Sequence, residues 1–133
     1  MDREYSAEWF RFADMDLDSA EFPLDKRPPP HEEICYRAQQ SAGKFLKGYL
    51  ISKGVSEPPR TRDLPNLCDM CREFDDSFIA IGRACDILAR YGVHPRYPGG
   101  IGVAAEETRM AIERAREIRG FECLAKARGE ASS

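Results

Sequence analysis

The sequence predicts an all-α fold, an antiparallel up-and-down bundle of four or five helices. No segment alternates apolar and polar residues for long enough to form a strand. Apolar residues instead recur at spacings of three and four, and the segments that carry them are joined by short, proline-rich connections. At 133 residues the chain is expected to form one domain, residues 1–133, with its core between about 7 and 125.

The segment from Ile34 to Gly54 is the longest one that favours an uninterrupted helix, and its two sides differ chemically. One side is broadly apolar and is expected to pack against the other helices. The other side is a cationic, amide-bearing stripe made up of Arg37, Gln40, Lys44 and Lys47, with Gln39 beside it. A solvated helix face usually mixes charges, but no acid lies between Glu33 and Glu57. The stripe is therefore a candidate anion site, and the alternative is a solvated face that answers the acidic first helix.

The other helices are expected at residues 3–20, 63–71, 74–91 and 103–126. A linker over residues 22–30, which contains three consecutive prolines, should separate the first helix from the central one. Gly54 should end the central helix as a C-terminal cap, and Asp63 should cap the short helix that follows. The tail over residues 128–133 is expected to be disordered.

Apolar spacing also predicts which side of each helix faces the core. In the first helix this side comprises Trp9, Ala13, Leu17 and Ala20. In the helix over 74–91 it comprises Phe74, Phe78, Ile81, Cys85 and Leu88. In the last helix it comprises Ala111, Ala115, Ile118 and Leu124.

Composition excludes several classes of protein. The net charge of -3 gives no global electrostatic attraction for nucleic acid, although fifteen of the twenty basic residues are arginine, which suits phosphate recognition. No apolar run approaches the roughly 20 residues of a membrane helix, and the N-terminus lacks the apolar core of a signal peptide. We therefore expect a cytoplasmic protein without membrane contact, whose five cysteines stay reduced.

Neither a metal nor a cofactor is expected. Cys68 and Cys71 form a single CxxC, which is half a zinc site, and packing of small thiols in the core is the commoner explanation. The alternating acids Asp14, Asp16 and Asp18 lack the glycine and the distal glutamate of a calcium loop.

Two further segments carry candidate chemistry. Arg60 and Arg62 follow the central helix and could extend its cationic stripe. The segment RYGVHPRYP, residues 90–98, places His94 between arginines, where it could act as a general acid or base in ribonuclease chemistry. The alternative is an exposed or structural histidine. The glycines that follow lack the strand and the GKS or GKT of a phosphate loop, so a flexible connection is the default.

Three segments in this order resemble the HEPN domain of prokaryotes: ICYRAQQSAGKFLKGYLISKGV, PPRTRDLPNLCDMC and ARYGVHPRYPGG. The resemblance covers about residues 7–125. It implies a helical bundle that often dimerises, nucleotide binding, and pairing with a minimal nucleotidyltransferase in a toxin–antitoxin-like system. Some branches are metal-independent ribonucleases with four to six residues between an arginine and a histidine. Here only three residues separate Arg90 from His94, and Arg37 and Arg62 stand where many relatives have histidine.

The sequence therefore favours a HEPN-like module that binds a nucleotide, RNA or another anion and is not an enzyme. It is expected to be a homodimer and a partner of a minimal nucleotidyltransferase. The candidate binding residues are Arg37, Gln39, Gln40, Lys44, Lys47, Arg62, Asp63, Arg96 and Tyr97. In this interpretation the cations pair with phosphates, the amides contact a base or sugar, and Tyr97 stacks. One alternative is a metal-independent ribonuclease that uses Arg90 and His94, and another is a purely structural partner that sequesters a nucleotidyltransferase through its apolar surface.

Overall fold

The computed structural model describes residues 3–22, 30–91 and 105–130, and every regular element in them is helical. The six α-helices are α1 (Arg3–Glu21), α2 (His31–Ser52), α3 (Leu64–Arg72), α4 (Gly82–Ala89), α5 (Ala105–Gly120) and α6 (Glu122–Ala127). A 3-10 helix, η2 (Asp76–Ile81), leads into α4. The predicted all-α bundle is confirmed. Within these three ranges no helix is both long enough and apolar enough to cross a membrane.

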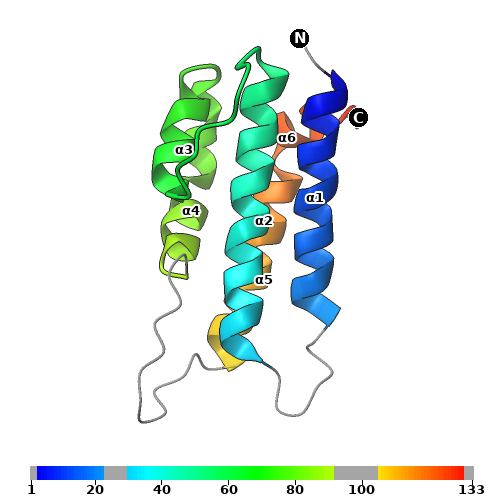
Figure 1. The fold of residues 1–133 in the computed structure, drawn as a ribbon. Coiled ribbons are helices and arrows are strands. Elements are labelled where there is room, and N and C mark those ends of the chain that lie inside the picture. Colours follow the sequence, from blue (N-terminus) through cyan, green and yellow to red (C-terminus); the bar gives the residue numbers. More distant parts are fainter. Residues whose placement is uncertain (1–2, 23–29, 92–104, 131–133) are drawn as a thin grey trace.

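Helix α2 is the central element, as its length and its apolar side predict. It lies between α1 on one side and α3 and α4 on the other, with α5 and α6 behind it (Figure 1), and it contacts all five. Its core side is fully buried and includes Ala38, Ala42, Phe45, Leu46, Tyr49 and Leu50. Packing of this one side against several helices supplies most of the stability that an isolated helix lacks.

Helices α1 and α2 pack antiparallel at close range. The ring of Phe10 lies directly over Gly48, and it stacks against Phe45 at a centroid distance of 6.4 Å. Deeper along the pair, the hydroxyl of Ser41 donates a 2.7 Å hydrogen bond to the carbonyl oxygen of Ala13. A glycine and a serine at these positions let the two backbones approach.

Helix α3 runs in the same direction as α2, which adds a parallel pair to the bundle. Gly54 ends α2 with a φ of +102°, and the amide of Val55 bonds back to the carbonyl of Leu50 at 3.1 Å, as in a Schellman cap. The chain then returns along the bundle to the start of α3 (Figure 1). Pro58 and Pro59 favour this extended return, because proline cannot continue a helix.

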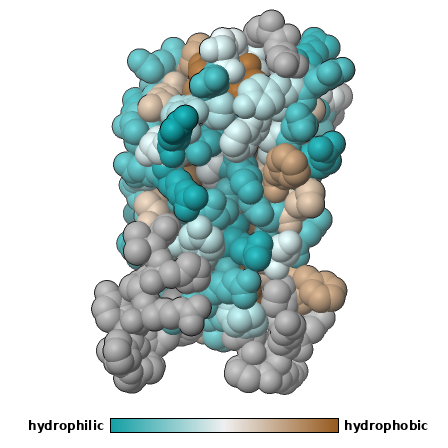
Figure 2. All heavy atoms as spheres, viewed as in Figure 1, coloured by the Kyte–Doolittle hydropathy of each residue, from teal (hydrophilic) through white to brown (hydrophobic). Residues whose placement is uncertain are grey.

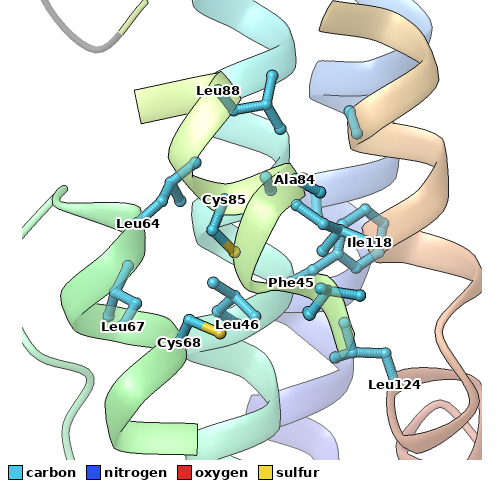
Figure 3. Packing of buried hydrophobic residues seen from close by; sticks show 14 of the residues in the cluster. Phe45, Leu46, Leu64, Leu67, Cys68, Ala84, Cys85, Leu88, Ile118 and Leu124 are labelled. Carbon is cyan, nitrogen blue, oxygen red and sulfur yellow. The ribbon is translucent and has the colours of Figure 1, made fainter. Parts of the chain in front are cut away.

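The two cysteines of the CxxC motif lie in the core. Figure 3 shows Cys68 of α3 and Cys85 of α4 directed into the same apolar cluster, between α2 and the outer helices. Both are buried, as is Cys71, and all three are free thiols. Burial raises the pKa of Cys71 far above its ordinary value, so this thiol is inert. The packing explanation of the CxxC is confirmed.

The segment over 74–91 differs from the single helix that its spacing predicts. Asp75 accepts hydrogen bonds from the amide and the hydroxyl of Ser77, at 3.0 and 2.6 Å, and these local bonds start a 3-10 turn. The α-helix begins only at Gly82. Phe78 lies in the 3-10 helix and is buried, as predicted. Phe74 precedes this helix and is 47% exposed, so its prediction as a core residue is wrong.

The last predicted helix is divided in two. Gly120 ends α5, and Phe121 adopts an extended backbone before α6 begins. All four residues predicted on its core side, Ala111, Ala115, Ile118 and Leu124, are buried. Residues 103 and 104, the linker over 23–29 and the loop over 92–102 lie outside the described residues.

Candidate functional site

The structure places the predicted cationic stripe along the exposed side of α2, beside α1 and the α2–α3 connection. This side of the molecule is predominantly hydrophilic (Figure 2). Three cations gather here, and we refer to them as the cationic face: Lys44, Lys47 and Arg62. Lys44 and Lys47 come one helical turn apart on α2, and Arg62 comes from the connection.

Lys47 is the centre of the cationic face. Its ammonium lies 5.9 Å from the ring centroid of Trp9, in cation–π geometry. Burial lowers the pKa of Lys47 from its ordinary value of 10.5, and the charges of Arg62 and then Lys44 lower it further. An anion bound beside Lys47 would relieve this repulsion.

Two aromatic rings of α1 extend the face. Trp9 is half-buried, and Tyr5 packs against it edge-to-face at a centroid distance of 6.4 Å. Aromatic rings beside cations form the kind of surface on which bases stack and phosphates pair. Apolar spacing predicts Trp9 as a core residue, and this prediction is wrong, because Trp9 is only half-buried. The same spacing gives no prediction for Tyr5. The sequence signal for this aromatic pair is its i, i+4 spacing, which places both rings on one side of a helix.

Gln39 holds the connection against α2. Its side chain is 2% exposed, and its amide nitrogen donates a 3.0 Å hydrogen bond to the carbonyl oxygen of Arg62. Its amide oxygen accepts from Gln40 at 3.1 Å. Gln39 therefore positions Arg62, whereas Gln40 is half-exposed at the edge of the face.

The guanidinium of Arg62 is exposed and is directed along the face. It donates a hydrogen bond to the hydroxyl of Tyr36 at 3.3 Å. The neighbouring Asp63 occupies the N-cap position of α3, as predicted, but its side chain makes no capping hydrogen bond. Its backbone amide instead bonds the hydroxyl of Thr61 at 3.1 Å.

Two of the predicted cations are partly neutralised within the protein. Lys44 pairs with Asp16 of α1 at 2.6 Å, because the antiparallel packing brings the two side chains together. Arg37 pairs with Glu33 one turn earlier on α2, at 3.4 Å. Lys47 and Arg62 are therefore the cations of the face that we consider first as partners of a bound anion.

The other predicted site residues lie elsewhere or are not described. Arg90 is exposed at the C-terminal end of α4, next to Tyr91, whose hydroxyl lies 3.5 Å from Glu107 at the start of α5. Arg90 is thus at the end of the bundle where α2 begins. His94, Arg96 and Tyr97 fall in the 92–104 segment, outside the described residues.

A metal centre is not formed by the acids of α1. Asp14 pairs with Arg119 at 2.7 Å and Asp16 with Lys44, so the carboxylates face cations of different helices. Across the part of the chain that the structure describes, no three histidine, cysteine or acidic side chains are grouped to hold a metal ion.

Comparison with known proteins identifies the family. The model of the HEPN domain matches residues 6–126, nearly the whole chain. Searches of curated proteins and of solved structures give no significant match. HEPN domains commonly dimerise. The chain therefore belongs to the HEPN domain family, as a helical module of a nucleotide- and RNA-related kind.

Proposed function

We propose that the cationic face binds the phosphates of a nucleotide or of single-stranded RNA. The observation that carries this proposal is Lys47, which lies against Trp9 and is repelled by two neighbouring cations. A cluster of like charges on an otherwise acidic protein is electrostatically unfavourable, and an anionic ligand would remove that cost.

The residues of the face have different roles in this proposal. Lys47 and Arg62 pair with phosphate oxygens, and Trp9 offers its ring to a base. Gln39 fixes the backbone of Arg62 against α2, and the Arg62 charge is close enough to lower the pKa of Lys47. Arg96 and Tyr97 remain candidates for further contacts, on the family resemblance.

The double variant Lys47→Gln/Arg62→Gln tests the phosphate contacts. We expect its dissociation constant for a single-stranded oligoribonucleotide to rise roughly 10–100-fold, because two charge-assisted contacts are lost. The slope of log K against log salt should fall by about 0.7 for each lost contact. Trp9 is the single tryptophan of the chain, so its fluorescence reports binding at this face directly.

Arg83→Gln/Arg109→Gln is the matched control, because it removes the same charge from exposed positions on α4 and α5. Equal losses of affinity in both double variants would reduce the effect to net charge and contradict a specific face.

The RNA should also be analysed for cleavage in EDTA, with His94→Ala as comparison. Cleavage that His94→Ala abolishes would establish the ribonuclease alternative with Arg90 and His94.

We further propose that the chain forms a homodimer and pairs with a minimal nucleotidyltransferase in a toxin–antitoxin-like system. The dimer proposal rests on the common dimerisation of HEPN domains and on an exposed apolar pair on α1, Phe12 and Met15, which are three residues apart. We expect Phe12→Ser/Met15→Ser to shift the mass in light scattering from dimer to monomer. Phe74→Ser/Ile79→Ser, which changes another exposed apolar pair, should leave it unchanged. Dimers that survive the α1 change would place the interface elsewhere, and co-purification with the nucleotidyltransferase tests the second partner.

A further inference from the structure

A second polar site lies on the other side of α1, at the end of the bundle where α1 begins, α2 ends and α6 packs (Figure 1). These elements enclose a groove of about 840 Å³, a volume typical of small-molecule sites. On α1 the groove is lined by positions 3, 6, 7, 10, 11 and 14, whereas the cationic face uses positions 5, 9 and 16. At 100° per residue these two sets lie on different sides of the helix.

Cations outnumber acids in the lining of the groove, although the protein has a net charge of -3. The cations of the lining are Arg3, Arg11, Lys53, Arg119, Lys126 and Arg128. Three acids accompany them in the lining, Asp14, Asp75 and Glu130. Two of the cations, Arg11 and Lys126, also pair with Glu8 and Glu122 outside the lining, at 4.0 and 3.2 Å. Ser6 and Ser52 add hydroxyls, and Phe10 and Tyr49 form part of an apolar wall.

Arg128 is built into the floor of this groove. Its side chain is only 7% exposed, and its guanidinium carbon lies 5.5 Å from the ring centroid of Phe45. Its Nη1 donates a 2.7 Å hydrogen bond to the carbonyl oxygen of Arg119. A guanidinium held from two sides is a preorganised partner for an oxyanion.

In the structure Arg128 forms an ion pair with a carboxylate of the same chain. Glu130 Oε2 accepts a 2.7 Å hydrogen bond from Arg128 Nε. A backbone turn brings it there, because Gly129 has a φ of +84° and the amide of Glu130 bonds the carbonyl of Ala125 at 3.0 Å. Arg128 lowers the pKa of Glu130, and Arg119 contributes in the same direction, so the carboxylate is charged at neutral pH.

We propose that this groove is a second binding site, for a small phosphate-bearing anion, and that Glu130 competes with that ligand for Arg128. The phosphates replace the Glu130 carboxylate at the guanidinium, and Arg3 and Lys53 at the rim pair with the remaining oxygens. The ligand is either a free polyphosphate or a nucleoside polyphosphate, since both present the same oxyanions. The site is independent of the cationic face.

Isothermal titration of the full chain with tripolyphosphate and, separately, with ATP tests the proposal. In the Lys47→Gln/Arg62→Gln background, where the cationic face no longer contributes, we expect Arg3→Gln/Lys53→Gln to weaken binding of both about tenfold or more, because two charge-assisted contacts are lost. Glu130→Gln should bind about two- to fivefold more tightly, since a competing surface ion pair is removed. Arg3, Lys53 and Glu130 are exposed, so these variants should fold normally.

Two control variants separate this site from the cationic face. Lys47→Gln/Arg62→Gln removes phosphate binding at the cationic face but should keep a tripolyphosphate site of unchanged affinity, and Arg83→Gln/Arg109→Gln should bind tripolyphosphate as the unaltered chain does. Equal affinities for the two probes identify the polyphosphate chain as the recognised part, and tighter ATP binding adds the nucleoside. The proposal is wrong if neither probe binds saturably at millimolar concentration, if Lys47→Gln/Arg62→Gln abolishes binding, or if Glu130→Gln weakens it.

Discussion

The variant Phe78→Ala is expected to lose about 3–5 kcal/mol of its free energy of unfolding, which is the cost of emptying a large aromatic site in a packed core. Phe78 is completely buried. Its ring contacts Tyr49 of α2 at a centroid distance of 4.5 Å and Phe121, before α6, at 5.0 Å. Two separate elements therefore lose a shared partner, and they cannot both move in to fill the space. Guanidinium unfolding followed by far-ultraviolet circular dichroism measures the loss.

Phe74→Ala is the matched control, because it removes the same side chain from an exposed position four residues earlier. We expect its free energy of unfolding to stay within about 0.5 kcal/mol of the unaltered chain. If both variants lost equal stability, a continuous helix over 74–91 would account for the data better than the 3-10 turn does.

Phe74 and Phe78 also show which kind of local structure the sequence does not predict. Apolar spacing located the central helix and the core side of the last one, because burial of one side at a period of 3.6 is what holds those helices in place. The segment over 74–91 has the same spacing, but Asp75 binds the amide of Ser77 and diverts the first turn. Such a local competition depends on geometry that composition does not reveal.

The direction of α3 could not be inferred in the same way. Short connections predict antiparallel neighbours. Here the chain after Gly54 returns along α2 in an extended form, and Gln39 anchors it through the carbonyl of Arg62. Nothing in the spacing around Gln39 distinguishes a buried amide from an exposed one.

The sequence predicts the part of the candidate site that lies on a single helix. The run without acids on α2 located Lys44 and Lys47, and the following loop suggested Arg62. The partners that complete or neutralise the face, Trp9 and Asp16, belong to α1. Their contact depends on the register between two helices, which a single sequence does not fix. The groove behind α1 was missed for the same reason, since its cations come from α1, α2, α5 and α6.

The register between α1 and α2 leads to the second stability prediction, which concerns Gly48→Ala. A Cβ at this position would lie 2.6 and 2.8 Å from two carbons of the Phe10 ring, closer than packed atoms allow. Overpacking of this kind costs about 1–3 kcal/mol, and removing a glycine from a helix interior returns about 1 kcal/mol. The Phe10 ring cannot easily turn away, because it is buried against Phe45. We therefore expect a net loss of up to about 2 kcal/mol in the free energy of unfolding.

Gly43→Ala, in the same helix, is expected to change the free energy of unfolding in the opposite direction. A Cβ there would meet Leu64 at 3.6 Å, an ordinary contact, so only the gain in helix propensity remains. We expect this variant to be more stable by about 0.5–1 kcal/mol. The two variants make the same change in the same helix, and they differ in burial and in what lies opposite the new methyl group. If Gly48→Ala were stabilised as much as Gly43→Ala, α1 would not approach α2 at Gly48, and the placement of Trp9 against Lys47 on the same helix pair would have to be revised.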